Sequence, residues 1–239
     1  ESDREFGLSV LERLDEILQE RGDLFRSRGV QDVPAFREQF PTESMPRLLL
    51  LIDEFQEFFV AEDRVSSRAS LLLDRLIRQG RAFGIHVLLG SQTLGGAYSL
   101  ARSTLGQVAV RIALQCSESD AHLILSDDNS AARLLTRPGE AIYNDANGLV
   151  EGNHPFQIAW LDEARREEAI HAMLRQQPAD HEDYSMVVFE GNVPPTAERC
   201  GPLNAELKPG PDATRRPSDG VRIWLGEPVA IAAPTPIEL

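Results

Sequence analysis

The residues best suited to chemistry are two adjacent carboxylates. Asp53 and Glu54 directly follow a run of five apolar residues, 48–52. Consecutive side chains at the end of a strand point in opposite directions, so the two carboxylates can do different work. One can hold Mg²⁺ and the other can polarise a water molecule, as hydrolysis of a nucleoside triphosphate requires. The alternative is a helix N-cap followed by a first-turn acid, which uses the same residue types to stabilise a helix.

A second group of polar residues, 91–93, follows the apolar run 85–89. In a parallel sheet the carboxyl ends of neighbouring strands meet at one edge, where ligands bind. Gln92 could sense the γ-phosphate there and orient the attacking water, or it could be part of an ordinary polar exit from a strand. Arg78 and Arg81 could stabilise charge, or they could cover the C-terminal end of a helix as favourable cations.

The elements that would position these residues follow from the spacing of apolar side chains. Short links between strand, helix and strand predict a parallel α/β sheet, with the run 48–52 buried on both of its faces. We expect helices over 8–28, 33–40, 66–81, 118–125, 130–135 and 162–176, strands over 48–52, 85–89 and 108–116, and an edge hairpin formed by 139–145 and 156–161 around a turn at 147–148.

Composition narrows the function classes. The net charge of −14 argues against a surface that coats nucleic acid, although it leaves room for a local basic loop. Cys116 and Cys200 are too few and too far apart for a disulfide framework or a metal site, which favours a reducing, cytoplasmic setting. No apolar run is long enough to span a bilayer, so we expect no membrane contact by this segment.

Prolines gather after residue 186 and indicate a change of organisation. We therefore expect one α/β domain over 1–185 and a proline-rich linker over 186–239, leading towards a possible following module.

Four segments occur in one order along the chain: LLLLIDEFQEFF (48–59), LDRLIRQGRAFGIHVLLGSQT (73–93), VRIALQCSESDAHLILSDDNSAARLL (110–135) and RPGEAIYND (137–145). Together they resemble the motor domain of the FtsK/SpoIIIE family of hexameric ATPases, and they are also similar to the EccC-type ATPases of type VII secretion. The resemblance covers residues 8–165. It implies a RecA-like P-loop NTPase core that uses ATP and Mg²⁺ and assembles with itself, as a homo-hexameric ring or as tandem modules.

The resemblance also implies roles for individual residues. Asp53 matches the Walker B aspartate, which holds Mg²⁺ directly or through water, and Glu54 matches the catalytic glutamate. Gln92 matches the polar sensor at the end of the next strand. Arg81 and Arg111 match family arginines, either of which could contact phosphate or complete a neighbouring subunit's site as an arginine finger.

The nucleotide site implied by the resemblance is incomplete in this sequence. A P-loop, GxxxxGK[ST], needs a lysine that reaches the β- and γ-phosphates. Lys208 is the only lysine and is followed by Pro209, so the Walker A motif is absent. Because the chain opens at Glu1 rather than Met, we expect the motif to lie upstream in a longer protein, which could carry a membrane anchor. We expect this chain alone to be inactive and the intact protein to be an ATPase.

The resemblance leaves the cargo open. The family's DNA motors move double-stranded DNA, for chromosome segregation and cell division, through pore loops that contact phosphates. The candidate pore loop here, residues 93–107, has Arg102 as its only cation, and Thr93 and Leu105 stand where the DNA motors often carry other residues. Translocation of double-stranded DNA is the first expectation. The alternatives are an EccC-like ATPase acting on secreted protein substrates and a non-hydrolysing interaction module.

Overall fold

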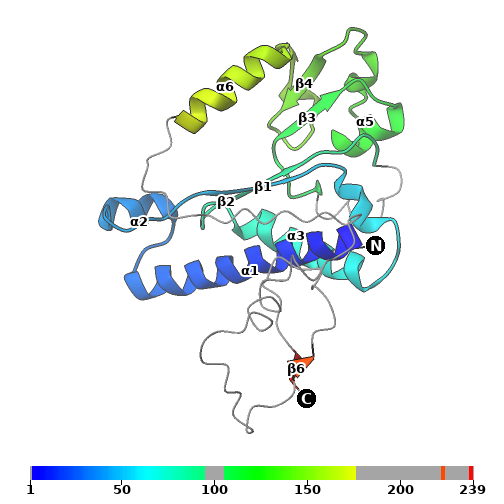
Figure 1. Cartoon of the computed structure of the whole chain (residues 1–239). Coiled ribbons are helices and arrows are strands. Elements are labelled where there is room, and N and C mark those ends of the chain that lie inside the picture. Colours follow the sequence, from blue (N-terminus) through cyan, green and yellow to red (C-terminus); the bar gives the residue numbers. More distant parts are fainter. Residues whose placement is uncertain (1, 95–104, 176–221, 224–236, 239) are drawn as a thin grey trace, which may run out of the picture. The chain divides into compact units, whose positions relative to one another are not determined.

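The computed structural model describes residues 2–94 and 105–175, together with two short strands near the C-terminus (Figure 1). Those strands, Arg222–Ile223 (β6) and Ile237–Glu238 (β7), pair antiparallel. The chain divides into two compact units. The larger, Asp15–Met186, contains the elements on which the site depends, and the smaller combines Glu1–Leu14 with Val187–Leu239. Apart from β6 and β7, the predicted linker lies outside the described residues.

Two helices precede the first strand, as predicted. Helix α1 spans Ser2–Arg28 and α2 spans Val33–Gln39. Asp32 begins α2 because its carboxylate accepts a hydrogen bond from the backbone N–H of Ala35 at 2.8 Å, which satisfies one of the free donors at the helix start. Pro34 lies in the first turn, where its missing N–H is not needed.

A cluster of buried aromatic and aliphatic side chains packs these helices together. The ring of Phe25 on α1 stacks on the rings of Phe36 and Phe83, with centroids 5.5 Å apart in each pair. Val30, Val33 and Met45 complete the buried part of the cluster. Aromatic pairs of this kind contribute about 0.5–1.5 kcal/mol each beyond their burial. The cluster therefore joins α1 and α2 to Phe83, which lies just before the second strand.

The candidate site is carried by a parallel pair of strands. Strand β1 (Leu48–Ile52) pairs with β2 (Ile85–Leu89) in a register that runs from Leu48 opposite Ile85 to Ile52 opposite Leu89. The crossover between them contains a 3₁₀ helix, η1 (Phe55–Phe59), and helix α3 (Arg64–Gln79). Because the strands run in the same direction and in register, the residues that follow them leave the sheet side by side.

Helix α3 packs against β2 through one apolar stripe. The carboxylate of Asp63 begins the helix by accepting a hydrogen bond from the N–H of Ser66 at 2.8 Å. Leu72, Leu73 and Leu76 lie one helical turn or less apart and are all buried. The sequence predicts this helix over 66–81, two residues later at each end than its observed bounds.

The opposite face of the sheet differs from the prediction. Leu49, Leu51 and Leu88 expose 68%, 62% and 53% of their surface, so β1 is not buried on both faces. The reason is that this sheet contains two strands in the described part of the chain and no described element covers these leucines. A continuous apolar run shows that a strand is suited to burial on both faces. Whether both faces are buried depends on the layers that pack on the sheet.

A second sheet, entirely antiparallel, has the order β3-β4-β5. Its strands are β3 (Arg111–Leu114), β4 (Glu140–Asn144) and β5 (Asn153–Gln157). The predicted hairpin is confirmed, with its second strand starting earlier than expected. The expectation that 108–116 adds a third parallel strand is wrong, because β3 pairs antiparallel with β4. An apolar pattern does not fix the direction of a strand's partner, which depends on the connection that brings the partner back.

Short helices cover the second sheet at the predicted places. Helix α5 spans Glu118–Ile124, and a 3₁₀ helix, η2, spans Ala131–Leu134. The cluster beneath them contains Ala113, Leu125 and Ile142, all buried. After β5, the exposed helix α6 (Glu163–Arg175) ends the second described segment, 105–175.

Buried asparagines fix the turn between β4 and β5. The side-chain oxygen of Asn144 accepts hydrogen bonds from the backbone N–H groups of Ala146 (3.0 Å) and Gly148 (2.7 Å). The Asn129 amide donates to the carbonyl of Gly148 at 2.7 Å. Asn147 and Gly148 lie within the connection 145–152 between these strands and have positive φ angles, 55° and 89°, which asparagine and glycine tolerate.

Candidate functional site

The carboxylate pair lies where β1 ends. Asp53 is exposed, and its Oδ1 accepts a hydrogen bond from the backbone N–H of Glu54 at 3.1 Å. Backbone pairing continues beyond the strand ends, because the N–H of Phe55 donates to the carbonyl of Gly90 at 3.1 Å. A Cβ on Gly90 would lie 3.1 Å from Asp53 Oδ1. Glycine therefore lets the end of β2 approach this carboxylate closely.

Glu54 has an unusual backbone conformation and a specific side-chain partner. Its φ and ψ, 53° and 46°, are left-handed, a conformation that is unfavourable for a residue other than glycine. Although Glu54 precedes η1, its side chain makes no capping hydrogen bond. Instead its Oε2 accepts a hydrogen bond from the Nε2 of Gln56. The helix-cap alternative therefore does not describe how this carboxylate is used.

Gln56 and Ser91 join the ends of the two strands. Gln56 lies on η1 and is 9% exposed, and its Oε1 accepts a hydrogen bond from the hydroxyl of Ser91 at 2.5 Å. Ser91 lies just beyond β2. Sequence reasoning placed Ser91 at this edge of the sheet, but it did not identify Gln56. The available signal was a single uncharged polar residue among three phenylalanines and two carboxylates in EFQEFF.

The predicted sensor, Gln92, does not take part in this contact. Its side chain is exposed, and no described residue forms a hydrogen bond with it. It nevertheless lies at the predicted edge of the sheet, one residue beyond Ser91. Its role as a sensor stays a prediction.

The chain beyond β2 is attached to α5 through Asp120. Asp120 Oδ1 accepts hydrogen bonds from the hydroxyl of Thr93 (3.1 Å) and the backbone N–H of Leu94 (3.0 Å), and its Oδ2 accepts one from Ser117 (2.7 Å). Partial burial acts to raise the pKa of Asp120, but the hydrogen bonds from Leu94, Ser117 and Thr93 outweigh it and lower the pKa. Asp120 is therefore a charged anchor for residues 93–94.

Arg111 is engaged in a structural contact. Its half-buried guanidinium donates hydrogen bonds to four backbone carbonyls, those of Leu105 (3.1 Å), Val108 (3.0 Å), Ile124 (3.1 Å) and Leu125. Burial lowers the pKa of this guanidinium, which still remains charged. The side chain ties the end of α5 to the segment before β3, and this use occupies four of the five N–H donors that an arginine finger would direct elsewhere.

The other predicted arginines lie away from the carboxylate pair or outside the description. Arg81 is exposed and precedes β2, at the end of the strand opposite to Gly90. Five strand residues span about 16 Å, so Arg81 does not approach Asp53 of its own subunit. An arginine finger acts on a neighbour, so this position leaves that prediction untested. Arg102 and most of the candidate pore loop lie outside the described residues.

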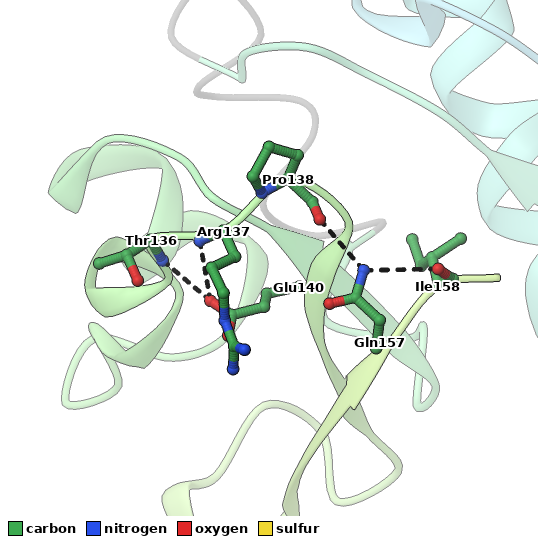
Figure 2. A network of polar contacts seen from close by, with 6 residues as sticks. All are labelled: Thr136, Arg137, Pro138, Glu140, Gln157 and Ile158. Atoms are coloured by element: carbon green, nitrogen blue, oxygen red, sulfur yellow. Dashed lines mark hydrogen bonds and ion pairs between the residues drawn. The ribbon is translucent and has the colours of Figure 1, made fainter. Parts of the chain in front are cut away.

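The RPGE segment (137–140) of the second sheet forms a self-contained polar turn (Figure 2). Glu140 Oε2 accepts hydrogen bonds from the backbone N–H groups of Arg137 (2.9 Å) and Thr136 (3.0 Å), and Oε1 pairs with the Arg137 side chain at 2.7 Å. These contacts, the Arg137 N–H first, lower the pKa of Glu140 to about 2. Across the sheet, the Gln157 amide donates to the Pro138 carbonyl at 3.0 Å. The segment is therefore a folding element of the β4–β5 hairpin.

The donor set of the carboxylate pair suits a magnesium ion shared with a substrate. Mg²⁺ prefers oxygen ligands and is commonly bound through one or two carboxylates, waters and substrate phosphates. Asp53 Oδ2 has no hydrogen-bond donor among the described residues, and the carboxylate is open to solvent. No group of three or more His, Cys, Asp and Glu residues in the described part could enclose a metal without such a substrate. None of the described helices is long and apolar enough to cross a membrane.

Comparison with known sequences gives a short but specific match. No protein-family model matches the chain. The ESX-5 secretion system protein EccC5 of Mycobacterium marinum is 44% identical over 50 residues, which is 21% of this chain and 3% of that protein. EccC5 of Mycobacterium tuberculosis matches equally well. The chain therefore spans only a small part of the length of these relatives.

Comparison with solved structures covers more of the fold. The pCW3 conjugation coupling protein TcpA, solved with ATPγS, is similar over 74% of this chain and 50% of its own, with a TM-score of 0.58 and 20% identity. The cytoplasmic domain of the type VII secretion ATPase EccC from Thermomonospora curvata is similar over 83% of this chain and 22% of its own, with a TM-score of 0.59 and 22% identity. ATPases 2 and 3 of EssC from Geobacillus thermodenitrificans give a TM-score of 0.50 at 14% identity, over 70% of this chain and 30% of theirs.

The structural similarity extends over most of the chain, and it includes both a coupling protein and secretion ATPases. The resemblance to FtsK/SpoIIIE-type and EccC-type ATPases is thereby confirmed, and the chain has the fold of their ATPase domains.

Proposed function

We propose that this chain is part of an ATP-hydrolysing motor of the FtsK/SpoIIIE type with a RecA-like core, in which it supplies the Walker B side of the nucleotide site. The observation that carries the proposal is the position of Asp53 and Glu54. They directly follow a strand of a parallel sheet, and the Glu54 carboxylate is held by Gln56 instead of capping a helix. An exposed carboxylate beside an oriented one is the arrangement that phosphoryl transfer to water requires.

Each residue has a separate task in this proposal. Asp53 would hold Mg²⁺ directly or through water, using the oxygen that does not accept the Glu54 N–H. The ion, when bound, neutralises charge on the β- and γ-phosphates. Glu54 would accept a proton from, and orient, the attacking water, while Gln92 would lie near the γ-phosphate. The P-loop contacts would come from a segment outside this sequence, so the isolated chain should not reach turnover of about 1–10³ s⁻¹.

The full-length product of the gene that encodes this chain provides the test. Its ATP turnover is measured beside that of a Glu54→Gln variant, which keeps shape and removes the basic oxygen. We expect turnover by the wild type and a loss of about 10²–10⁴-fold in the variant, the range for removing a general base. Absence of ATP turnover in the wild type, with or without DNA, would refute the proposal.

Double-stranded DNA is the cargo that we propose first. The ordered resemblance to FtsK/SpoIIIE motors extends over residues 8–165 of the chain, and a conjugation coupling protein is among the similar structures. A DNA motor neutralises phosphates, so its DNA affinity should fall steeply with salt concentration and its ATP turnover should rise with duplex length.

A protein substrate is the second candidate. The net charge of −14 and the EccC5 match favour it, and so does a candidate pore loop with one arginine as its only cation. In that case ATP turnover should not respond to duplex DNA, and affinity for duplex DNA should be absent at 150 mM salt. The two cargoes are therefore distinguished by one titration of the full-length protein with DNA.

A further inference from the structure

The contact between Gln56 and Glu54 is chemically directed. A carboxylate only accepts hydrogen bonds, so the amide nitrogen of Gln56 must face Glu54 and the amide oxygen must face away. That oxygen meets the Ser91 hydroxyl, which donates to it at 2.5 Å. The two neighbours of Gln56 thus fix the orientation of its amide from opposite sides.

We propose that Gln56 is the positioning residue of the hydrolytic site. It fixes the orientation of the Glu54 carboxylate and connects that carboxylate to the end of β2 through Ser91. This rests on the proposed ATPase function and adds a residue to it. Gln56 does not touch substrate. It acts through Glu54, whose side chain has no other hydrogen-bond donor among the described residues.

Orientation of Glu54 needs such a contact because its own backbone supplies little restraint. The residue lies in a left-handed turn between β1 and η1, and its side chain has several rotatable bonds. Gln56 is 9% exposed, and Phe55 and Phe58 on the same 3₁₀ helix are also buried, so the Gln56 side chain has little free space in which to move. A fixed amide can hold a mobile carboxylate, and a displacement of about 1 Å at a reacting group reduces rate by about 10²-fold.

Ser91 gives this contact two possible states. Its hydroxyl lies 2.5 Å from Gln56 Oε1 and 2.6 Å from the carbonyl oxygen of Thr93, yet it has a single proton to donate. When Ser91 donates to Gln56, the amide is supported. When it donates to Thr93, whose side chain is bound to Asp120 on α5, the support is lost. Ser91 therefore links the orientation of Glu54 to the segment that α5 anchors.

The test compares shape-conserving variants in the full-length protein. Gln56→Met keeps the volume and removes both hydrogen bonds, and Ser91 retains Thr93 as an acceptor, so folding should survive. We expect kcat for ATP hydrolysis to fall about 10²-fold while KM for ATP changes less than about threefold. Ser91→Ala should lower kcat by a smaller factor of about 3–10, the equivalent of one hydrogen bond of about 1 kcal/mol.

A double variant separates positioning from general damage. In a Glu54→Gln background, adding Gln56→Met should not lower the residual rate further, because Gln56 acts only through the Glu54 carboxylate. Gln19→Ala is the matched control, since the Gln19 amide also donates to a carboxylate, Asp15 Oδ2 at 2.9 Å, on α1. It should leave kcat unchanged. A further fall in the double variant, or a kcat for Gln56→Met within threefold of wild type, would overturn the positioning role.

A spectroscopic measurement on residues 1–239 tests the contact between Gln56 and Glu54 separately from ATP hydrolysis. The side-chain amide signal of Gln56 in a ¹⁵N-labelled sample should shift in Glu54→Gln and Ser91→Ala, and it should not shift in Gln19→Ala. If it does not shift in Glu54→Gln, the contact and the proposal both fall. If it shifts but wild-type full-length protein hydrolyses no ATP, the ATPase function fails and the catalytic role fails with it, while the contact stands.

Discussion

Replacing Arg111 by leucine tests whether this side chain is structural, as its contacts indicate, or an arginine finger, as the resemblance allows. Leucine keeps part of the apolar stem and removes every donor. Four carbonyls then lose a charged partner, two of them, Ile124 and Leu125, at the end of α5. The other two, Leu105 and Val108, belong to the segment just before β3.

The size of the stability loss depends on how many of these carbonyls can accept a hydrogen bond from water once the arginine is gone. A hydrogen bond from a charged donor contributes about 1.5–3 kcal/mol net. Arg111 is half-buried, so we count the two bonds at the end of α5 at the low end of that range and take the other two as replaced by water. The expected loss is about 3 kcal/mol of unfolding free energy, which for a protein of this size lowers Tm by about 6–12 °C.

The assay is thermal and urea unfolding of residues 1–239, followed by circular dichroism. Arg133→Leu is the control, because Arg133 pairs with Glu118 on the same helix, α5, with both side chains more than half exposed. It should change stability by less than about 0.5 kcal/mol. If Arg111→Leu is as stable as the control, the structural reasoning is refuted. A defect confined to ATP turnover of the assembled protein would then favour the arginine finger.

Two further predictions concern the second sheet. Gly148→Ala should destabilise the chain by more than about 3 kcal/mol, measured by urea unfolding, because φ is +89° and a Cβ would lie 1.9 Å from the Leu125 carbonyl oxygen; a stable variant would show that the turn is not as described. The carboxyl of Glu140 should titrate near pH 2 by NMR, because the Arg137 and Thr136 N–H groups favour its charged form. Since this pKa is depressed, the contribution of Glu140 to stability is present above its ordinary pKa of 4.5 and is lost as pH falls towards 2. Glu140→Gln should remove that pH dependence of stability. A titration midpoint near 4.5 would contradict the geometry of the turn.

Much of the local structure could be predicted because it depends on neighbours in sequence. The apolar spacing predicts a helix over 66–81, within two residues of α3 at each end, and β2 has the bounds of its apolar run. The turn at 147–148, within the connection between β4 and β5, follows from an asparagine and a glycine that tolerate positive φ. The position of Asp53 and Glu54 at a strand's end is equally local. These features need only residues within a few positions of each other.

The pairing of strands could not be predicted in the same way. Residues 108–116 have the composition of a buried parallel strand, yet β3 pairs antiparallel with β4. The leucines of β1 suit burial on both faces, yet Leu49 and Leu51 are exposed. Direction and burial depend on which distant segment arrives alongside, and the apolar pattern is the same in either case.

The sequence by itself determined which residues could do chemistry: a carboxylate pair after a strand, a polar strand exit, and no P-loop lysine. Only the tertiary structure decided how those groups are held. It brought Gln56 and Ser91, 35 residues apart, into contact beside Glu54, and it engaged Arg111 with four carbonyls. The physical reason is that residue type sets what a side chain can donate or accept, whereas its partner is chosen by the register of parallel strands and by the packing of the helices between them.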